Sequence, residues 1–154
     1  MRLTFDPPGS PEWSWAPCIV AWHDDVHVAF FDARTGSFEI YYRRSRDGGA
    51  TWEDERGLTG ALDPTELGRW RPSLAAIGDR LEIAFWVPVP GGDSAALAMH
   101  SFDGGDSWSI PLEFSDGPAA VHPAVALSAS GIAHLAWYDR MDGNDEMFYR
   151  TLSP

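Results

Sequence analysis

An eight-residue stretch occurs twice in this chain of 154 residues, and it constrains the fold more than any other feature. Residues 45–52 read SRDGGATW and residues 101–108 read SFDGGDSW, so both copies fit the pattern S-x-D-G-G-x-[ST]-W. The paired glycines permit the positive φ angles of a tight hairpin, and the aspartate carboxylate can accept backbone N–H groups across the turn. The tryptophan then anchors the outgoing strand in the core. Eight residues are therefore assigned a structural role in these turns: Ser45, Asp47, Gly49, Trp52, Ser101, Asp103, Gly105 and Trp108.

The two turns belong to a longer repeat that is present three times. Each copy starts at a proline with a short apolar run, turns into a second apolar strand, and returns through a hairpin into a third strand. The second strands (27–32, 82–87 and 134–139) are nearly all apolar, which is typical of strands covered on both faces. No segment has helical periodicity, so the sequence predicts an all-β chain. The predicted single unit of residues 1–154 has repeats at approximately 14–60, 69–115 and 120–154.

The repeated turn resembles the Asp-box of the BNR repeat, a motif of sialidases and of many other β-propeller proteins. The hairpin at 30–45, FFDARTGSFEIYYRRS, is similar to the stretch W-x-D-x-R-x-G-x-x-E-I-Y-Y-R-R-S of sialidase-like repeat proteins, and residues 137–150 are similar too. Together these matches cover nearly the whole chain. The resemblance implies a β-propeller of four-stranded blades, with the Asp-box turn between the third and fourth strands. It identifies the fold better than the function.

The two ends of the chain predict how the propeller closes. The third copy stops where its fourth strand should begin, and residues 2–4 align without gaps opposite residues 57–59, the expected fourth strand of the first copy. A strand at 2–5 is therefore predicted to complete a third blade, beside residues 147–149. Propellers close with about four to eight blades. We expect three four-stranded blades per chain, half of a six-bladed propeller closed by homodimerisation; a third chain and a longer natural array are the alternatives.

The resemblance places the Asp-box turns on the face opposite the usual ligand face. The residues predicted to bind a ligand on that other face are Trp15, Trp70, Arg69, Arg71, His122 and Arg34. Aromatic faces suit pyranose rings, and charged groups suit hydroxyls, so a glycan is the predicted partner. Four carboxylates are candidate catalytic groups: Asp32, Glu39, Asp139 and Glu146. Because the first pair recurs as the second pair in the repeat, the pattern favours hairpin braces paired with arginine over catalysis.

Sialidase activity, as the resemblance implies it, needs an arginine two residues before the proline of the first strand. Trp15, Trp70 and Val121 stand there instead, and Arg71 is one residue off, which on a regular strand means the other face. We therefore expect a non-catalytic, sialidase-like propeller module that binds carbohydrate and assembles as a dimer. One alternative is a glycoside hydrolase with paired carboxylates on the central face. Another is a propeller fragment or an engineered protein without a ligand.

Composition excludes other classes of partner. A net charge of −12 and the absence of lysine argue against nucleic acid and anionic membranes. The acidic loop at 139–146 has the oxygen density of a calcium site without the spacing of an EF-hand, so a solvated turn is favoured and no metal or cofactor is predicted. With no apolar run at the N-terminus, we expect a soluble, cytoplasmic protein without a signal peptide or membrane span.

Overall fold

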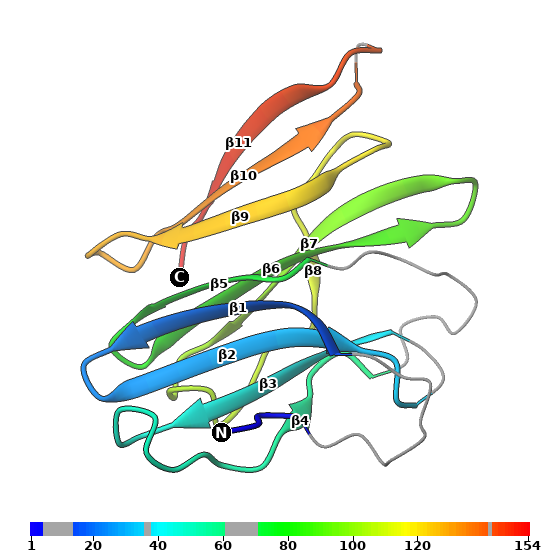
Figure 1. The fold of residues 1–154 in the computed structure, drawn as a ribbon. Coiled ribbons are helices and arrows are strands. Elements are labelled where there is room, and N and C mark those ends of the chain that lie inside the picture. The colour runs from blue at the N-terminus through cyan, green and yellow to red at the C-terminus, as the bar shows by residue number, and fades with distance from the viewer. Residues whose placement is uncertain (5–13, 36–37, 61–70, 142) are drawn as a thin grey trace.

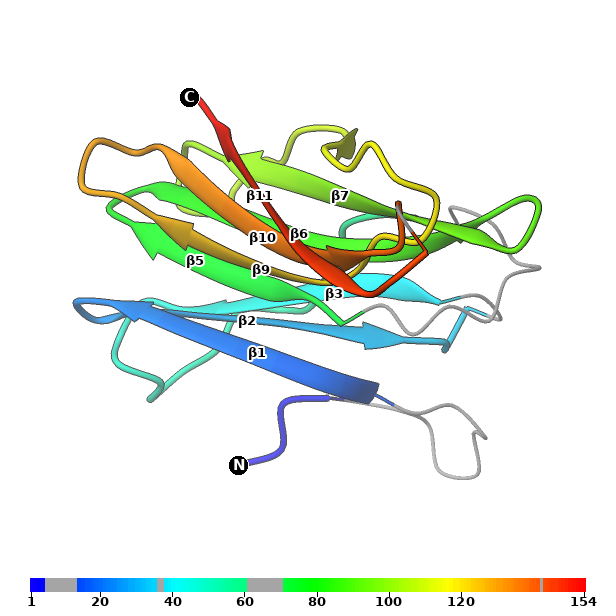
Figure 2. The same ribbon diagram turned by 90° about the horizontal axis from the view of Figure 1, so that it is seen from above.

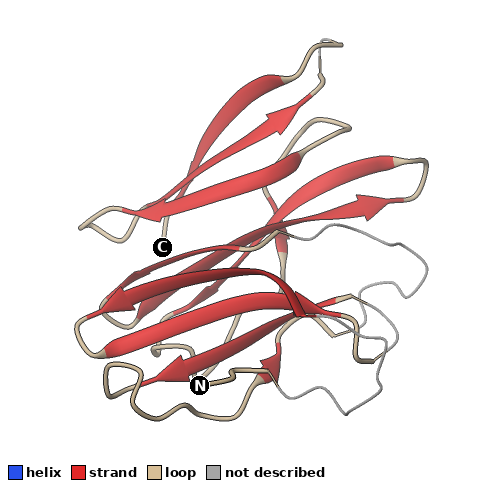
Figure 3. Ribbon diagram, in the orientation of Figure 1, coloured by secondary structure: helices blue, strands red, loops and turns tan. Residues whose placement is uncertain are grey.

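The computed structural model describes residues 1–4, 14–35, 38–60, 71–141 and 143–154 (Figure 1). Within these residues the chain forms eleven β-strands and no helix (Figure 3), so the all-β prediction is confirmed. The strands are β1 (Ser14–Trp22), β2 (Asp25–Asp32), β3 (Glu39–Ser45), β4 (Arg56–Gly57), β5 (Ser73–Ile77), β6 (Arg80–Val89), β7 (Asp93–Ser101), β8 (Leu112–Glu113), β9 (Val121–Leu127), β10 (Ala133–Asp139) and β11 (Glu146–Leu152).

The strands form three antiparallel sheets, one for each repeat. The first sheet has the order β1-β2-β3-β4, the second β5-β6-β7-β8, and the third β11-β10-β9. The sheets are stacked face to face in chain order, as Figures 1 and 2 show from two directions. The third sheet has three strands in the described part of the chain, where the prediction had four.

Two apolar clusters hold the stack together. The cluster between the first and second sheets consists of Ala29, Phe31, Ile40, Leu74, Ile83, Phe85 and Met99. The cluster between the second and third sheets consists of Ala84, Ala96, Ala98, Phe114, Ala120, Leu135 and Trp137. Burying such side chains contributes roughly 1.5–3 kcal/mol each for the larger ones, so packing between sheets is the main source of stability.

The second strand of each repeat shows how many of its faces are covered. Residues 27–32 in β2 are all buried, because one face packs on the second sheet and the other lies under N-terminal residues and Trp52. In β10, Leu135 and Trp137 are buried, whereas Tyr138 is exposed. The prediction that β10 is covered on both faces is therefore wrong for the single chain. Within the described residues no sheet lies beyond the third one.

The N-terminal residues do not pair with the third sheet of their own chain. Residues 2–4 have no strand structure, and Leu3 packs on the outward face of the first sheet near Val28 and Phe30. Arg43 donates from Nη1 to the carbonyl oxygen of Leu3 at 2.6 Å. The chain's first residues and β11 lie at opposite ends of the stack (Figure 1), so the predicted strand cannot reach its own third sheet. Residue 5 lies outside the described residues.

The two turns at 45–52 and 101–108, called DGG turns below, are braced by their aspartates in the same way. Asp47 accepts bonds at Oδ1 from the Ser45 hydroxyl at 2.7 Å and from the Thr51 N–H at 2.8 Å. The Thr51 hydroxyl bonds to Oδ2 at 2.6 Å. These bonds from Thr51 and Ser45 lower the pKa of Asp47 to about 2. Asp103 accepts the equivalent bonds, so both aspartates brace their turns.

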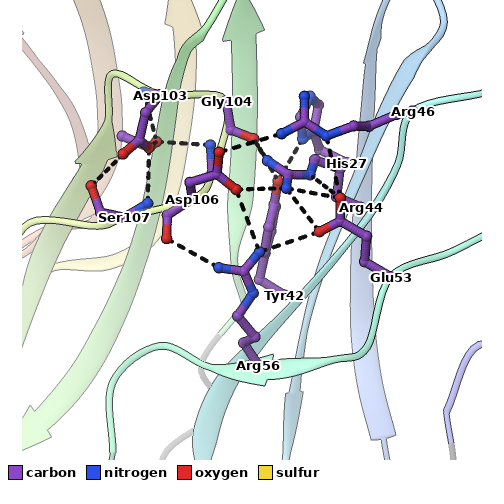
Figure 4. A network of polar contacts seen from close by, with 12 residues as sticks. His27, Tyr42, Arg44, Arg46, Glu53, Arg56, Asp103, Gly104, Asp106 and Ser107 are labelled. Atoms are coloured by element: carbon purple, nitrogen blue, oxygen red, sulfur yellow. Dashed lines mark hydrogen bonds and ion pairs between the residues drawn. The ribbon is translucent and has the colours of Figure 1, made fainter.

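A buried arginine connects the first sheet to the second DGG turn (Figure 4). Arg44 is 3% exposed, and its guanidinium contacts the carboxylates of Glu53 at 2.8 Å and of Asp106 at 2.7 Å. It also donates to the carbonyl oxygen of Gly104. Because Asp106 and Gly104 belong to the second repeat, these bonds set the position of one sheet relative to the next.

Candidate functional site

The two ends of the stacked sheets differ in what they carry. One end, the turn end, carries both DGG turns, and the N–H groups of Gly48 and Gly104 bond there to the carbonyls of Asp24 and Asp79, in the connections β1–β2 and β5–β6. The other end, the hairpin end, carries the hairpins β6–β7 and β10–β11. Two hollows open at the hairpin end, away from the DGG turns.

The larger hollow has a volume of about 410 Å³ and lies beside the third sheet. Tyr138, at the end of β10, is 45% exposed and presents its ring to this hollow. His122 stands edge-on to Tyr138, with ring centroids 6.4 Å apart, and stacks on Trp86 at 6.3 Å with an interplanar angle of 11°. The hollow is lined by Ser94, Ala119, Val121, His122, Tyr138, Arg140 and Asp145.

One ion pair stands at the rim of this hollow. Arg140 donates from Nε to Oδ1 of Asp145 and from Nη2 to Oδ2 at 3.2 Å, and both side chains are exposed. Their mutual hydrogen bond raises the pKa of Arg140 and lowers the pKa of Asp145. The site therefore offers a fixed cation and a fixed anion beside two aromatic rings. Such groups can bond to the hydroxyls of a ligand whose apolar face lies on the rings.

Strand irregularities give the hollows their shape. His122 has φ 54° and Ala16 has φ 47°, a region that non-glycine residues seldom adopt. Both precede the first proline of their strand, and both coincide with a register shift in the sheet. Such a bulge interrupts the alternation of side chains. Val121 and His122 consequently line the same hollow, although they are adjacent in sequence.

The structure also changes the interpretation of Arg71. Side chains alternate between the two faces of a strand, so the sequence predicted that Arg71 lies on the face opposite that of the preceding residue. In the structure Arg71 lines the smaller hollow, of about 290 Å³, together with Trp15, Ala16 and Phe31. Arg71 precedes β5, which begins at Ser73, so strand alternation does not place its side chain, and the exclusion of Arg71 on that ground is withdrawn.

The predicted ligand-binding residues are divided among three places. Trp15 and Arg71 line the smaller hollow, and His122 lines the larger one. Arg34 is bound to the carboxylates of Asp32 and Glu55 and lies over the ring of Tyr41, with its Cζ 4.4 Å from the ring centroid. Arg69 and Trp70 lie outside the described residues.

The candidate carboxylates of the first repeat belong to one hairpin. Asp32 is fully buried and accepts bonds from the Ser14 hydroxyl at 2.7 Å and the Arg34 N–H at 2.8 Å. Burial acts to raise the pKa of Asp32, but the bonds from Arg34 and Ser14 outweigh it and lower the pKa. Glu39 stands directly opposite Asp32 in the ladder, is 7% exposed, and accepts the Thr35 hydroxyl at 2.6 Å. Both carboxylates are thus used inside the protein.

The third repeat uses its aspartate in the same way. Asp139 is buried and accepts the N–H groups of Arg140 at 2.7 Å and Ala119 at 3.2 Å. Its Oδ2 has no hydrogen-bond partner, and the Asp139 carboxyl group is in close contact with Gly117. Glu146 stands opposite Asp139 and is exposed. The repeated aspartates therefore hold the hairpin to the strand that enters the sheet.

Sequence reasoning did not identify four of the residues that form the larger site: Trp86, Ser94, Tyr138 and Asp145. The position of Tyr138 carried a signal, because Phe31 and Trp86 stand at the same place in the other repeats. Because each second strand leads into a hairpin, an aromatic residue near its end lies at the hairpin end of the stack. Only the structure shows that Tyr138 is open to solvent.

In the part of the chain that the structure describes, no group of three or more His, Cys, Asp or Glu side chains is arranged to hold a metal ion. Asp142, in the loop considered for calcium, lies outside it. Across the same described ranges, no helix is long and apolar enough to cross a membrane.

Comparison with known proteins connects this geometry to a fold. No family model matches the chain, and no curated protein matches it either. Solved structures similar to it include a Hadza microbial sialidase (16% identity, TM-score 0.63, covering 91% of this chain and 35% of that one). Trypanosoma rangeli sialidase in complex with the inhibitor DANA matches with 17% identity and a TM-score of 0.64, covering 91% of this chain and 29% of that one.

A third similar structure is a family 117 glycoside hydrolase from the marine bacterium Zobellia galactanivorans. It has 12% identity and a TM-score of 0.64, and the match covers 97% of this chain and 56% of that one. The chain thus spans between 29% and 56% of the length of these proteins. At such identities the likeness shows the fold: the stacked antiparallel sheets are blades of a β-propeller.

Proposed function

We propose that this chain is a non-catalytic β-propeller module that binds carbohydrate in the larger hollow at its hairpin end. The observation that carries the proposal is the pairing of two exposed ring systems, Tyr138 and His122, with the ion pair of Arg140 and Asp145. A pyranose ring has an apolar face and a rim of hydroxyls, and this site offers a partner for each. The volume of about 410 Å³ lies in the range of small-ligand sites.

The propeller fold and the structurally similar proteins support a sugar as the ligand class. Two of the neighbours named above are sialidases, and the third is a glycoside hydrolase. A polyanionic glycan is disfavoured by the net charge of −12, so we expect a neutral saccharide, held by stacking and by bonds to its hydroxyls.

A binding role is favoured over hydrolysis by the state of the carboxylates. A glycosidase needs two carboxyl groups that flank the scissile bond and are open to it. Asp32 and Glu39 are buried neighbours in one hairpin, and Asp139 is buried under residues 117–119. Glu146 is exposed but has no second open carboxylate opposite it, because its partner in the ladder is Asp139.

A glycan array followed by calorimetry tests the proposal. The array identifies the best saccharide, and calorimetry then compares the parent with Tyr138→Ala and Arg140→Ala. Each substitution should weaken binding about ten-fold, the loss expected for one stacking or charged contact. Trp22→Ala is the matched control, because Trp22 is 39% exposed but lies at the turn end, as the last residue of β1. Binding that survives both substitutions and is lost with Trp22→Ala would place the site elsewhere.

The DGG turns provide a second control. Asp47→Ala should lower the melting temperature, because the turn loses the bonds from Ser45 and Thr51. The fraction that stays folded should bind the saccharide with unchanged affinity. Unchanged melting together with abolished binding would mean that the turn is part of the site.

Absence of hydrolysis is tested with chromogenic glycosides and a fluorogenic sialoside. None should be turned over faster than in buffer. Turnover of the sialoside that disappears with Arg71→Ala would contradict the proposal, because Arg71 lines the smaller hollow and could anchor a carboxylate there.

A further inference from the structure

The third sheet has an open edge strand, and two junctions inside the same chain show what fits it. β11 is the outer strand of the third sheet in the described residues. In the first and second sheets the corresponding strands, β3 and β7, are each covered by a short fourth strand. The residues that follow each fourth strand also pack onto the next sheet.

At the first junction the covering segment makes two bonds to one residue of β3. The N–H of Leu58 donates to the carbonyl of Ile40 at 2.7 Å, and the N–H of Ile40 donates to the Thr59 hydroxyl at 3.0 Å. The Leu58 side chain packs against the cluster that contains Ile83 and Phe85 of the next sheet. The segment therefore joins two sheets: its backbone bonds to one and its side chain packs on the other.

The second junction repeats this arrangement residue by residue. The N–H of Phe114 donates to the carbonyl of Ala96 at 2.9 Å, and the N–H of Ala96 donates to the Ser115 hydroxyl at 3.0 Å. The Phe114 side chain packs with Leu135 and Trp137 of the third sheet. An apolar residue followed by a hydroxyl residue is thus the joining unit in both places.

Leu3 and Thr4 form the same unit at the N-terminus, and Leu3 already occupies half of such a junction. Leu3 packs on the outward face of the first sheet against Val28 and Phe30, which are the counterparts in β2 of Leu135 and Trp137. The bond from Arg43 to its carbonyl keeps it there. The backbone that Leu3 and Thr4 would bond to is missing from that place, because no sheet precedes the first one in the described chain.

We propose that the missing sheet is the third sheet of a second copy of this chain. Leu3 of one copy donates its N–H to the carbonyl of Met147 in the other, and the N–H of that Met147 donates to the Thr4 hydroxyl. Met147 is the residue of β11 that corresponds to Ile40 in β3 and Ala96 in β7. The same chain cannot make these bonds, because Leu3 and β11 lie at opposite ends of the stack (Figures 1 and 2).

The uncovered face of the third sheet matches a face that is buried at the first junction. Met147 is 71% exposed and Tyr149 is 64% exposed, whereas their counterparts Ile40 and Tyr42 are 0% and 1% exposed beneath the second sheet. On the receiving side, the first sheet has a hollow of about 190 Å³ lined by Leu3, Thr4, Ser14, Pro17, Val28 and Phe30. An apolar side chain of the facing sheet fills the equivalent space at the internal junctions.

Two copies of the chain are the number that closes a ring of blades. Each copy supplies three sheets, and propellers have about four to eight blades, so six is the multiple of three within that range. A two-fold axis makes both junctions the same, and each copy then gives one face and receives one. Formation of this ring does not depend on the sugar site.

Light scattering on the 154-residue chain gives the first test. The mass should be about twice 17.0 kDa at micromolar concentration. A monomer, or a mass that grows beyond two copies with concentration, overturns the proposal. Leu3→Asp and Met147→Asp should each give a monomer, because each variant places a carboxylate in both junctions. Ile110→Asp is the matched control, since Ile110 is 85% exposed and lies on neither face.

A mixing experiment separates this head-to-tail arrangement from other dimers. In a mixture of Leu3→Asp and Met147→Asp chains, one of the two junctions combines only unchanged faces. The mixture should therefore recover a mass of about two copies, although each variant alone is monomeric. If the third sheets instead paired with each other, Leu3→Asp alone would remain a dimer, and that result would overturn the proposal.

The hydroxyl of Thr4 provides the finest test. Thr4→Val removes the acceptor for Met147 at both junctions and should raise the dissociation constant at least about ten-fold, whereas Thr4→Ser should leave it nearly unchanged. Amide hydrogen exchange gives a direct readout, because the N–H of Met147 should be protected in the parent and exchange rapidly in Leu3→Asp. Equal exchange in both proteins would contradict the proposed bond.

Discussion

One histidine–tyrosine pair occurs twice in this chain, in two different surroundings. His27 and Tyr42 are joined by a 2.6 Å hydrogen bond with ring centroids 6.0 Å apart, and His134 and Tyr149 by a 2.7 Å bond with centroids 6.1 Å apart. The first pair is buried under the DGG turn 101–108, and the second is on the open face of the third sheet. The repeat thus determines the geometry of the pair, and the neighbouring sheet determines its surroundings.

Burial changes the chemistry of the pair. It lowers the pKa of His27 to about 4, because the charged imidazolium has lost most of its water. Burial also raises the pKa of Tyr42, because the charged phenolate would lose its water in the same environment. A polar side chain buried at this position therefore stabilises the fold only if its hydrogen bonds are made within the protein.

The largest effect should come from the contact between Tyr42 and the second DGG turn. A Cβ at Gly105 would clash with the Tyr42 hydroxyl oxygen, whereas a Cβ at Gly49 would lie 3.8 Å from the nearest atom, in Trp52. Both glycines have φ near 90°, so the backbone strain is the same. Gly105→Ala should cost about 3 kcal/mol or more, and Gly49→Ala about 1–2 kcal/mol. Urea denaturation measures both, and equal costs would mean that the turn is not tightly packed under the first sheet.

The buried histidine should make stability fall in weak acid. The unfolded chain binds a proton at His27 near pH 6.5, whereas the folded chain binds it only near pH 4. Protonation therefore favours unfolding as the pH falls from 6.5 to 4, by about 3 kcal/mol in total. Urea titrations across this range should show the loss in the parent, and the His27→Gln profile should lack this component. Parallel profiles for the two proteins would contradict a buried neutral imidazole.

The second sheet carries a glutamate at the same repeat position, with the opposite pH dependence. Burial raises the pKa of Glu82 to about 7, although Arg80 lies 3.4 Å away and acts against it. The folded chain then holds a proton that the unfolded chain releases near pH 4.5, so stability is lost as the pH rises from 4.5 to 7, by up to about 3 kcal/mol. Glu82→Gln should remove this loss and gain relative stability at pH 8. A parent profile that rises with pH, while that of Glu82→Gln stays level, would contradict it.

The smallest change in the free energy of unfolding is expected when the hydroxyl groups of the two tyrosines are removed one at a time. Tyr42→Phe leaves buried His27 without its bonding partner and should cost about 1–2 kcal/mol. Tyr149→Phe, on a dissociated chain, should change the free energy of unfolding by less than about 0.5 kcal/mol, because His134 can bond to water. Denaturation of a monomeric variant such as Leu3→Asp gives this comparison free of assembly. A similar cost at both positions would mean that the pair itself, and not its burial, matters.

The features of this protein that depend on local chemistry could be predicted from the order of its residues. The glycines and the aspartate of each DGG turn fix its bonds within eight residues, so both turns have the same geometry. The braced hairpin at Asp32 was predictable for the same reason, because a carboxylate that recurs in the first and third copies near an arginine serves the backbone nearby. The all-β, repeated architecture follows from apolar runs that are too short and too regular for helices.

Whether a repeated residue meets solvent or another sheet depends on the packing of the folded chain and could not be predicted from the repeat. His27 and His134 stand at the same position of the repeat, yet His27 is fully buried and His134 only half-buried. The site beside Tyr138 also depends on a bulge at His122, where a positive φ places two adjacent side chains in one hollow. Leu3 belongs to the repeat in sequence but lies on the first sheet in space. The spacing of residues in the sequence determines the hydrogen bonds within a turn or hairpin. Burial depends on which other sheet packs against a residue, and that is a property of the whole stack.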